Sequence, residues 1–322
     1  MKLDPDSDNL PKRSEITPGP GEPEGTAWVW GKDDELGRLN LLTPRRKLAA
    51  AKLIQHGESV NLDWSAFLPN PPAFGREPFE FKIKSLGPMG NDDLYNMNTQ
   101  SGSQWDGFRH VAMPHGDKHV FYNNLYQEEI LSGTRCGIHA WADHGIVGRG
   151  VLIDYWAYAK KHSKTYDPTT THAIPLSELL ACAAEQNTTF QYGDILIIRS
   201  GYIEYYNGLS QEARAAITGT GIYDFNFVGV KVDDDMLDFL HDNYFAAVAG
   251  DMPAFEAWPP KAPFVAHTFL LPCWGLPIGE MWDLERLAEV CRKRGKWEFF
   301  FSSKPANVPG GVGSHPNAMA IF

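Results

Sequence analysis

Short apolar runs alternate with amphipathic segments along this chain, and the alternation predicts its secondary structure. Two runs rich in β-branched residues, 150–155 (GVLIDY) and 194–199 (DILIIR), have the length and composition of buried strands. A third apolar run, 244–249, is another candidate strand. Helical composition or periodicity is found in segments 48–55, 176–186, 233–240 and 284–294. Strands and helices in alternation predict a mixed α/β fold.

Charged and turn-forming residues mark the ends of several of these helices. Segment 233–240 has acidic residues in its first turn, where the helix dipole favours them. Segment 284–294 follows a capping residue, Asp283, and ends in three basic residues at the negative end of the dipole. Segment 48–55 stops near Gly57. These local signals predict where the helices begin and end.

The chain divides into a short first segment and one large domain. Residues 1–24 are polar and rich in Pro and Gly, which predicts a flexible arm or a strap over the surface. No repeat or linker divides the remainder, so residues 25–322 are expected to form a single domain.

Composition narrows the classes of partner. The 322 residues are 43% hydrophobic and carry a formal net charge of −11. Nucleic acids and anionic membrane surfaces attract positive charge, so both are disfavoured as partners. Aromatic residues make up 12% of the chain. Most of these rings are expected to fill the core, and some to line a pocket for a planar small molecule.

The cysteines and the apolar runs indicate a cellular location. The four Cys residues are scattered without a C-x-x-C pair, which is typical of reduced, mostly buried thiols. The first residues have neither the apolar run of a signal peptide nor the Arg-rich character of a transit peptide, and no run of eighteen apolar residues follows. We therefore expect a cytoplasmic protein.

Candidate catalytic residues are most dense in segment 99–122. If this backbone is extended, the side chains of Gln104, Asp106, Phe108 and His110 share one face. A carboxylate and an imidazole that project together can bind a metal ion or act as an acid–base pair. Judged by residue types alone, a polar surface loop with solvated histidines explains this pattern about as well as a functional site does.

Two further candidates lie downstream. Asp251 and Glu256 follow the apolar run 244–249, and acidic residues after a buried strand often sit at a ligand-binding mouth. An Asp that caps a turn before Pro253 is nearly as good an interpretation. His267 and Glu280 follow later, although a single His after an apolar segment is more often structural. The chain has no G-x-S-x-G motif, no P-loop and no G-x-G-x-x-G after a strand, which disfavours a serine hydrolase or a nucleotide cofactor.

Several segments in order resemble the cyclase family, which includes bacterial kynurenine formamidases, isatin hydrolases and trans-dienelactone hydrolases. The resemblance runs from about Trp30 to the end of the chain. It is carried by WGKDDELGRLNLLTP, GIVGRGVLIDY, YGDILIIRSGY, VAGDMPAFEAWP and GGVGSHPNAMAI, at 30–44, 145–155, 192–202, 248–259 and 310–321. The resemblance implies one α/β domain with a central β-rich body of swivelling β/β/α type and flanking helices. It also implies a homodimer or a higher homo-oligomer.

The family's site motif, H-x-G-x-H-x-D-x-P-x-H, falls on residues 100–110. Its glycine, aspartate and last histidine match at Gly102, Asp106 and His110. Both leading histidines are replaced, by Gln100 and Gln104, and Phe108 stands in place of the proline. The family's downstream His and Glu ligands match His267 and Glu280.

The resemblance implies a metal site held by Asp106, His267 and Glu280, with Gln104 as a further ligand. One divalent ion, Zn or Mn, suits such a set. A metal-free site stays open as an alternative, because a Gln amide oxygen is a weaker ligand than imidazole.

The activity implied is hydrolysis of an amide, ester or lactone bond in a small cyclic or aromatic substrate. A metal-activated water would attack the carbonyl, with His110 as base and Glu256 as a second acid or base. Trp105, Phe108 and Trp274 are expected to form apolar walls of the substrate pocket. Arg109 is expected to bind a carboxylate group of the substrate. One alternative is a non-hydrolytic cyclase, dehydratase or isomerase that uses Asp106 and His110 as an acid–base pair. Another is a binding module without activity.

Overall fold

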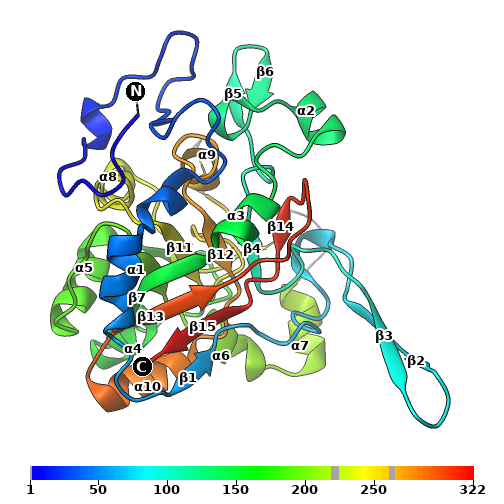
Figure 1. Ribbon diagram of the computed structural model, residues 1–322. Helices are drawn as coiled ribbons and strands as arrows, with labels where there is room; N and C mark the ends of the chain where they lie inside the picture. Colours follow the sequence, from blue (N-terminus) through cyan, green and yellow to red (C-terminus); the bar gives the residue numbers. More distant parts are fainter. Residues whose placement is uncertain (1, 219–224, 261–264) are drawn as a thin grey trace.

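The computed structural model describes residues 2–218, 225–260 and 265–322, and one large sheet runs through them (Figure 1). Within the described residues this sheet has nine strands, in the order β1-β15-β13-β7-β9-β11-β12-β4-β14. The strand bounds are β1 Ser59–Asn61, β4 Gln104–Asp106, β7 Ile146–Ile153, β9 Ile195–Ile198, β11 Ala247–Gly250, β12 Ile278–Glu280, β13 Glu298–Ser303, β14 Gly313–Ser314 and β15 Ala318–Ile321.

The middle of the sheet is parallel and its two sides are antiparallel. Strand β9 lies parallel to β7 and β11, and β11 lies parallel to β12. Every residue of β9 and β11 is buried, as expected where helices or loops cover both faces of a parallel sheet. Beyond β12 the direction reverses, because β4 pairs antiparallel with both β12 and β14. The predicted mixed α/β class is confirmed.

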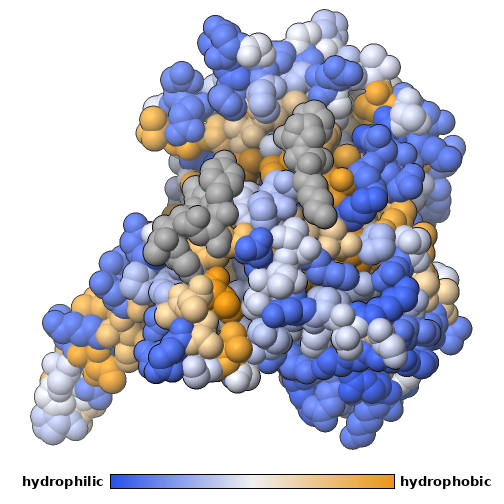
Figure 2. All heavy atoms as spheres, turned by 180° about the vertical axis from the view of Figure 1, so that it is seen from behind, coloured by the Kyte–Doolittle hydropathy of each residue, from blue (hydrophilic) through white to orange (hydrophobic). Residues whose placement is uncertain are grey.

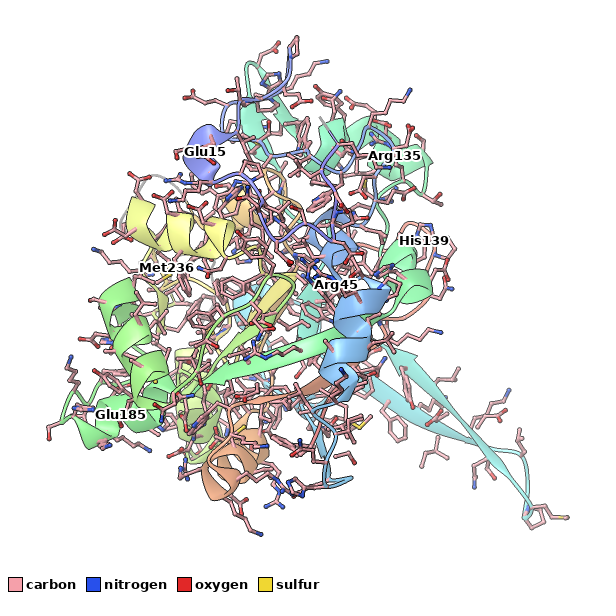
Figure 3. The ribbon with its side chains drawn as sticks, turned by 60° about the vertical axis from the view of Figure 1, so that its left-hand side comes forward. Glu15, Arg45, Arg135, His139, Glu185 and Met236 are labelled. Carbon is pink, nitrogen blue, oxygen red and sulfur yellow. The ribbon has the colours of Figure 1, made fainter. Side chains whose placement is uncertain are left out.

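Helices pack around this sheet. They are α1 Pro44–Ala51, α2 Gln127–Ser132, α3 His139–His144, α4 Tyr155–Lys161, α5 Leu176–Glu185, α6 Tyr202–Asn207, α7 Gln211–Ile217, α8 Asp234–Asp242, α9 His267–Leu270 and α10 Glu285–Arg294. Helix α1 packs on β7 and β13, and α5 packs between β7 and α8. Figure 3 looks onto these helices, with Arg45 on α1, Glu185 on α5 and Met236 on α8.

The predicted helices at α5, α8 and α10 are confirmed, whereas the first predicted helix was misplaced. The helix runs from Pro44 to Ala51, so only residues 48–51 of the predicted segment 48–55 are helical. It starts earlier than predicted because the Thr43 side chain accepts a hydrogen bond from Arg46 N and caps it. The predicted strand 150–155 ends at Ile153, since Asp154 caps α4 by accepting from Ala157 N. The capping of α4 by Asp154 therefore ends strand β7 two residues earlier than the apolar pattern predicts.

Three two-stranded sheets lie outside the central one in the described part of the chain. They are β2 Glu80–Ser85 with β3 Asn91–Asn96, β5 Met113–His115 with β6 Lys118–Val120, and β8 Ala173–Ile174 with β10 Gly229–Val230. The β2–β3 hairpin projects away from the body of the molecule (Figure 1).

Residues 2–24 lie over the surface of the domain as a strap. Arg13 forms ion pairs with Asp234 and Asp238 of α8, at 2.9 and 2.5 Å. The Tyr244 hydroxyl donates to the carbonyl of Pro11 at 2.6 Å, and Leu10 is buried. The segment thus folds against the domain rather than standing apart from it.

Two other expectations concern the cysteines and membrane spans. All four Cys are free thiols and buried, as predicted. Among the described residues, no helix combines the length and the apolar character needed to cross a membrane.

Candidate metal centre

The pairing of β4 with β12 brings the first candidate residues together. Gln104 of β4 lies directly opposite Glu280 of β12, and Asp106 lies opposite Ile278. Because side chains alternate along a strand, Gln104 and Asp106 project from the same face of β4, as predicted. All three polar side chains are almost fully buried. The strand ends at Asp106, so Phe108 and His110 do not continue this face.

His267, the first residue of α9, faces both carboxylates. Its Nε2 atom lies 3.4 Å from Oδ2 of Asp106 and 3.0 Å from Oε1 of Glu280. Within the described residues, neither of these two buried oxygens has a hydrogen-bond partner. The other ring nitrogen, Nδ1, lies 2.8 Å from Oε2 of the buried Glu256. One ring nitrogen is therefore oriented by a carboxylate while the other points at two unsatisfied oxygens.

Two glutamine amides hold the remaining carboxylate oxygens. Gln104 Nε2 donates to Oδ1 of Asp106 at 2.9 Å and to Oε2 of Glu280 at 2.8 Å. Gln100 Nε2 also donates to Oδ1 of Asp106. The ionised Asp106 carboxylate can only accept, so turning either amide round would set the amide oxygen against Oδ1 of Asp106. The Gln104 oxygen thus points away from the carboxylates, and the expectation that it is a metal ligand does not fit this geometry.

Charge and burial act together on the ionisable groups of this cluster. Burial favours the neutral form of Asp106, but the neighbouring His110 and His267 outweigh it and lower the pKa of Asp106. Burial and the Asp106 carboxylate raise the pKa of Glu280 to about 8. Burial opposes the charged form of His267, yet the carboxylates of Glu256, Asp106 and Glu280 raise its pKa well above the usual value. The cluster of acids therefore favours a positive charge at its centre.

These atoms fit a divalent metal ion. Asp106, His267 and Glu280 each offer one ligand atom, and these atoms all lie within 4.8 Å of one another. One imidazole nitrogen and two carboxylate oxygens are ligands that Zn²⁺ and Mn²⁺ accept. Glu256 would accept the hydrogen bond that a metal-binding His usually donates from its other nitrogen. An ion between these three atoms would satisfy Oδ2 of Asp106 and Oε1 of Glu280, which lack hydrogen-bond partners in the described residues.

His110 lies beside this cluster rather than in it. Its Nε2 atom is 4.0 Å from Oδ1 of Asp106, and its side chain is 21% exposed, more than that of His267 or the acids. Burial lowers the pKa of His110, which favours a neutral imidazole that can accept a proton.

The four residues expected to bind substrate have structural surroundings instead. Trp105 projects from the opposite face of β4 and donates from Nε1 to Ser303 Oγ at 2.9 Å. Phe108 is fully buried against Tyr122 and Trp141. Trp274 is buried and donates to the carbonyl of Gly25. These side chains fill the core and do not fit the predicted role of pocket walls.

Arg109 is committed to the protein backbone. Its guanidinium donates to four carbonyl oxygens, those of Arg135, Ile130, Gly133 and Gly310. A guanidinium has five N–H donors, so little capacity is left for a substrate carboxylate. The predicted substrate contact does not fit this arrangement.

Three residues near the site were not among the predicted site residues. Gln100 was recognised only as a departure from the motif, although it holds Asp106. A Cβ at Gly313 would lie 2.1 Å from Gln100 Oε1, so this glycine leaves room for the amide. Arg76 donates to the Gln100 carbonyl. Its charge helps to lower the pKa of Asp106 and opposes the rise in the pKa of Glu280. The loop that carries Arg76 has no motif that points to it.

Asp251 has a structural role, but it binds the segment after β9 rather than capping the turn before Pro253. Its carboxylate accepts from Ser200 N and Oγ, and from Gly201 N at 2.8 Å. These bonds join the segments that follow β9 and β11 and use both oxygens of Asp251.

Comparison with known proteins places the chain in a family. The family described as "Putative cyclase" matches residues 42–257, and the chain belongs to this cyclase family. One similar solved structure is a crystal structure of a novel cyclase, whose sequence is 31% identical to this chain. The two structures have a TM-score of 0.79, and the match covers 91% of this chain and 98% of that one. No curated protein matches the chain by sequence.

Isatin hydrolases share the fold at low identity. An isatin hydrolase bound to the product analogue thioisatinate is 14% identical, with a TM-score of 0.56 over 87% of this chain and 99% of that one. Isatin hydrolase A from Labrenzia aggregata, bound to benzyl benzoate, is 14% identical with a TM-score of 0.55, over 86% of this chain and 98% of that one.

Proposed function

We propose that this protein is a metal-dependent hydrolase that cleaves an amide, ester or lactone bond in a small cyclic or aromatic substrate. The observation that carries the proposal is the arrangement at His267 Nε2. Two buried carboxylate oxygens face it at 3.4 and 3.0 Å, and neither has a hydrogen-bond partner in the described part of the chain. The isatin hydrolases that share this fold support hydrolysis of a cyclic amide as the starting hypothesis.

A divalent ion bound by Asp106, His267 and Glu280 would lower the pKa of a water molecule and polarise a carbonyl group. Glu256 accepts from Nδ1–H of His267 and so keeps Nε2 directed at the two carboxylates. Gln104 and Gln100 fix the other carboxylate oxygens. These contacts orient the ligands before substrate arrives.

His110 is the proposed base. Its Nε2 atom lies 4.0 Å from Oδ1 of Asp106, and its side chain is partly exposed. A neutral imidazole there can take a proton from water and return it to the leaving nitrogen or oxygen. Glu256, fully buried and hydrogen-bonded to His267, serves as an orienting residue rather than as a second acid or base.

A second candidate is non-hydrolytic acid–base chemistry, such as ring closure, dehydration or isomerisation. It is favoured by the two glutamine amides, whose N–H groups already neutralise part of the charge on the carboxylates. Asp106 and His110 would then act on the substrate as an acid–base pair, one giving a proton and the other taking one, with Nε2 and Oδ1 4.0 Å apart.

Turnover in ¹⁸O-labelled water separates the two candidates. The purified protein would be incubated with a panel of small cyclic amides, aryl esters and lactones, isatin among them. Hydrolysis inserts one labelled oxygen into the product, whereas ring closure, dehydration or isomerisation inserts none. Product without label would contradict the proposed hydrolysis.

A pair of histidine variants tests the base. We expect His110→Ala to lower kcat by about 10²–10⁴-fold. His119→Ala, on the exposed β5–β6 hairpin, is the matched control and should retain activity. Equal activity of both variants would exclude His110 as the base.

A further inference from the structure

Arg76 is a half-buried cation beside the candidate metal centre. It lies in the loop between a short 3₁₀ turn, Ala73–Gly75, and strand β2, whose hairpin projects at the lower left of Figure 2. Its Nη1 atom donates to the backbone carbonyl of Gln100, and the Gln100 side chain donates to Asp106. Gln100 thus links this guanidinium to a proposed metal ligand.

The charge of Arg76 also reaches the proposed base. Burial is the first cause of the lowered pKa of His110, and the positive charge of Arg76 lowers it further, whereas Asp106 opposes the change. A nearby like charge disfavours the charged form of an imidazole. The guanidinium therefore lies within electrostatic reach of the residue that would take the proton from water.

Most of the hydrogen-bonding capacity of Arg76 is unused by the protein. A guanidinium has five N–H donors. Within the described residues, Arg76 makes a single hydrogen bond, to the Gln100 carbonyl, and no carboxylate forms an ion pair with it. Arg109, in contrast, donates to four carbonyl oxygens. Arg76 therefore keeps donors for an anionic ligand, which Arg109 does not.

An aromatic ring lies against the same guanidinium. Cζ of Arg76 is 4.9 Å from the centre of the Phe74 ring. The Phe74 ring is in turn 5.1, 6.1 and 6.0 Å from three others, those of Phe225, Phe227 and Trp258. Phe74 has a φ of 62°, in the left-handed region that a bulky side chain rarely adopts, and such strain is most common at functional sites. An aromatic surface thus adjoins the unpaired cation.

Two segments connect these aromatic rings with the metal centre. One is the loop of Phe74 and Arg76, which is bonded to Gln100. The other follows strand β11 and carries both Trp258 and Glu256, the residue that orients His267. A substrate at the metal centre would therefore have a cation and an aromatic surface beside it.

We propose, on the basis of the proposed hydrolysis, that Arg76 binds a carboxylate group of an aromatic substrate whose ring packs against Phe74. The planar guanidinium matches the two oxygens of a carboxylate. Arg76 forms no ion pair with Asp106 or Glu280, so the carboxylate is a different group from the carbonyl at the metal ion. One guanidinium beside several acids favours a singly charged anion over a phosphate, which carries more negative charge. The substrates are thus aromatic acids with a separate amide, ester or lactone bond.

Binding of 2-naphthoate and of its neutral analogue 2-naphthalenemethanol to the purified full chain tests this assignment without turnover. In isothermal titration, we expect the wild-type protein to bind 2-naphthoate about 10–100-fold more tightly, because hydrogen bonds between two charged groups are stronger than neutral ones. Arg76→Gln should lower this ratio of affinities to about one. Arg286→Gln, at an exposed arginine of α10, is the matched control and should keep the wild-type ratio.

Two results would overturn the assignment. One is a wild-type protein that does not prefer 2-naphthoate, and the other is an Arg76→Gln variant that keeps the wild-type ratio, as it would if the carboxylate bound the metal ion. Arg76→Lys serves if Arg76→Gln does not fold, which circular dichroism reports. Lysine keeps the charge without the planar fork, so its ratio should fall below that of the wild type. An undiminished ratio in a folded Arg76→Lys variant would contradict binding by the guanidinium.

Turnover separates failure of this inference from failure of the proposed hydrolysis. With 4-acetoxybenzoate, an aryl ester that bears a carboxylate, Arg76→Gln should raise KM about 10–100-fold and leave kcat nearly unchanged. With phenyl acetate, which lacks the carboxylate, KM should stay the same. Equal changes in KM for both esters would contradict the assignment of Arg76. If the wild-type protein hydrolyses neither ester but its preference for 2-naphthoate depends on Arg76, the hydrolysis is wrong and the carboxylate site stands.

Discussion

Nδ1 of His267 and Oε2 of Glu256 lie 2.8 Å apart, and both side chains are buried. This hydrogen bond sets the direction of the imidazole, and so decides that Nε2 faces Asp106 and Glu280. The geometry of the whole candidate site depends on it, although Glu256 itself offers no atom to the predicted ligand set.

Glu256→Gln is therefore expected to weaken binding of Zn²⁺ or Mn²⁺ by about 10–100-fold, because an amide orients and polarises the imidazole less than a carboxylate does. Competition against a chromophoric chelator measures the affinity. Glu212→Gln, on the exposed surface of α7, is the matched control. Equal affinities for the two variants would show that the Glu256 contact does not support the metal site.

Gln104→Leu is expected to weaken metal binding by about 10–100-fold while leaving the stoichiometry at one ion per chain. The variant removes the N–H donor shared by Asp106 and Glu280, but none of the proposed ligand atoms. Isothermal titration gives both quantities, with the exposed Gln211→Leu as control. Affinity equal to that of the control would argue against an orienting role for Gln104.

Features of the fold and of the candidate site that depend on neighbouring residues could be predicted from the sequence, whereas those that depend on contacts between distant residues could not. Helices α5, α8 and α10 follow from periodicity and capping, which depend on neighbouring residues. The shared face of Gln104 and Asp106 follows from strand alternation. The approach of His267 and Glu280 to Asp106 came only from the family resemblance, because it depends on the pairing of β4 with β12.

The substrate-binding residues show why the remainder could not be predicted. Arg109 is the kind of side chain that binds a carboxylate, but segment 130–135 and Gly310 supply carbonyls that use its donors. Trp105 is adjacent to Asp106 in sequence and therefore projects from the opposite face of the strand. Residue type and position along the chain do not reveal such distant partners.

The stability of the protein should depend on pH through Asp63. Burial raises the pKa of Asp63 to about 6 in the folded state, above its ordinary value of 3.8. The stabilisation from the bound proton is complete below pH 3.8 and is lost as pH rises through 6. Asp63→Asn should therefore increase the free energy of unfolding by about 1–2 kcal/mol at pH 8.

Urea unfolding between pH 5 and pH 8 checks this expectation. The gain from Asp63→Asn should shrink as the pH falls toward 5, because folded Asp63 is then largely protonated. Asp117→Asn, on the exposed β5–β6 turn, serves as the control. A gain that is the same at pH 5 and pH 8 would contradict the raised pKa.

Gly279 of β12 should tolerate no side chain. A Cβ there would lie 2.5 Å from Cζ2 of Trp282 and 2.8 Å from Cβ of Ala249, both buried. Gly279→Ala is expected to lower the free energy of unfolding by about 1–3 kcal/mol. Gly90→Ala, where the nearest atom is 3.9 Å away, should have little effect. Equal stability of the two variants in urea unfolding would refute the predicted overlap.

Anomalous scattering from a crystal soaked with Mn²⁺ or Zn²⁺ tests the central claim most directly. The metal-centre hypothesis predicts one peak in contact with Oδ2 of Asp106, Nε2 of His267 and Oε1 of Glu280, with Glu256 still bonded to Nδ1. At a saturating ion concentration, the absence of a peak between these three atoms would contradict it.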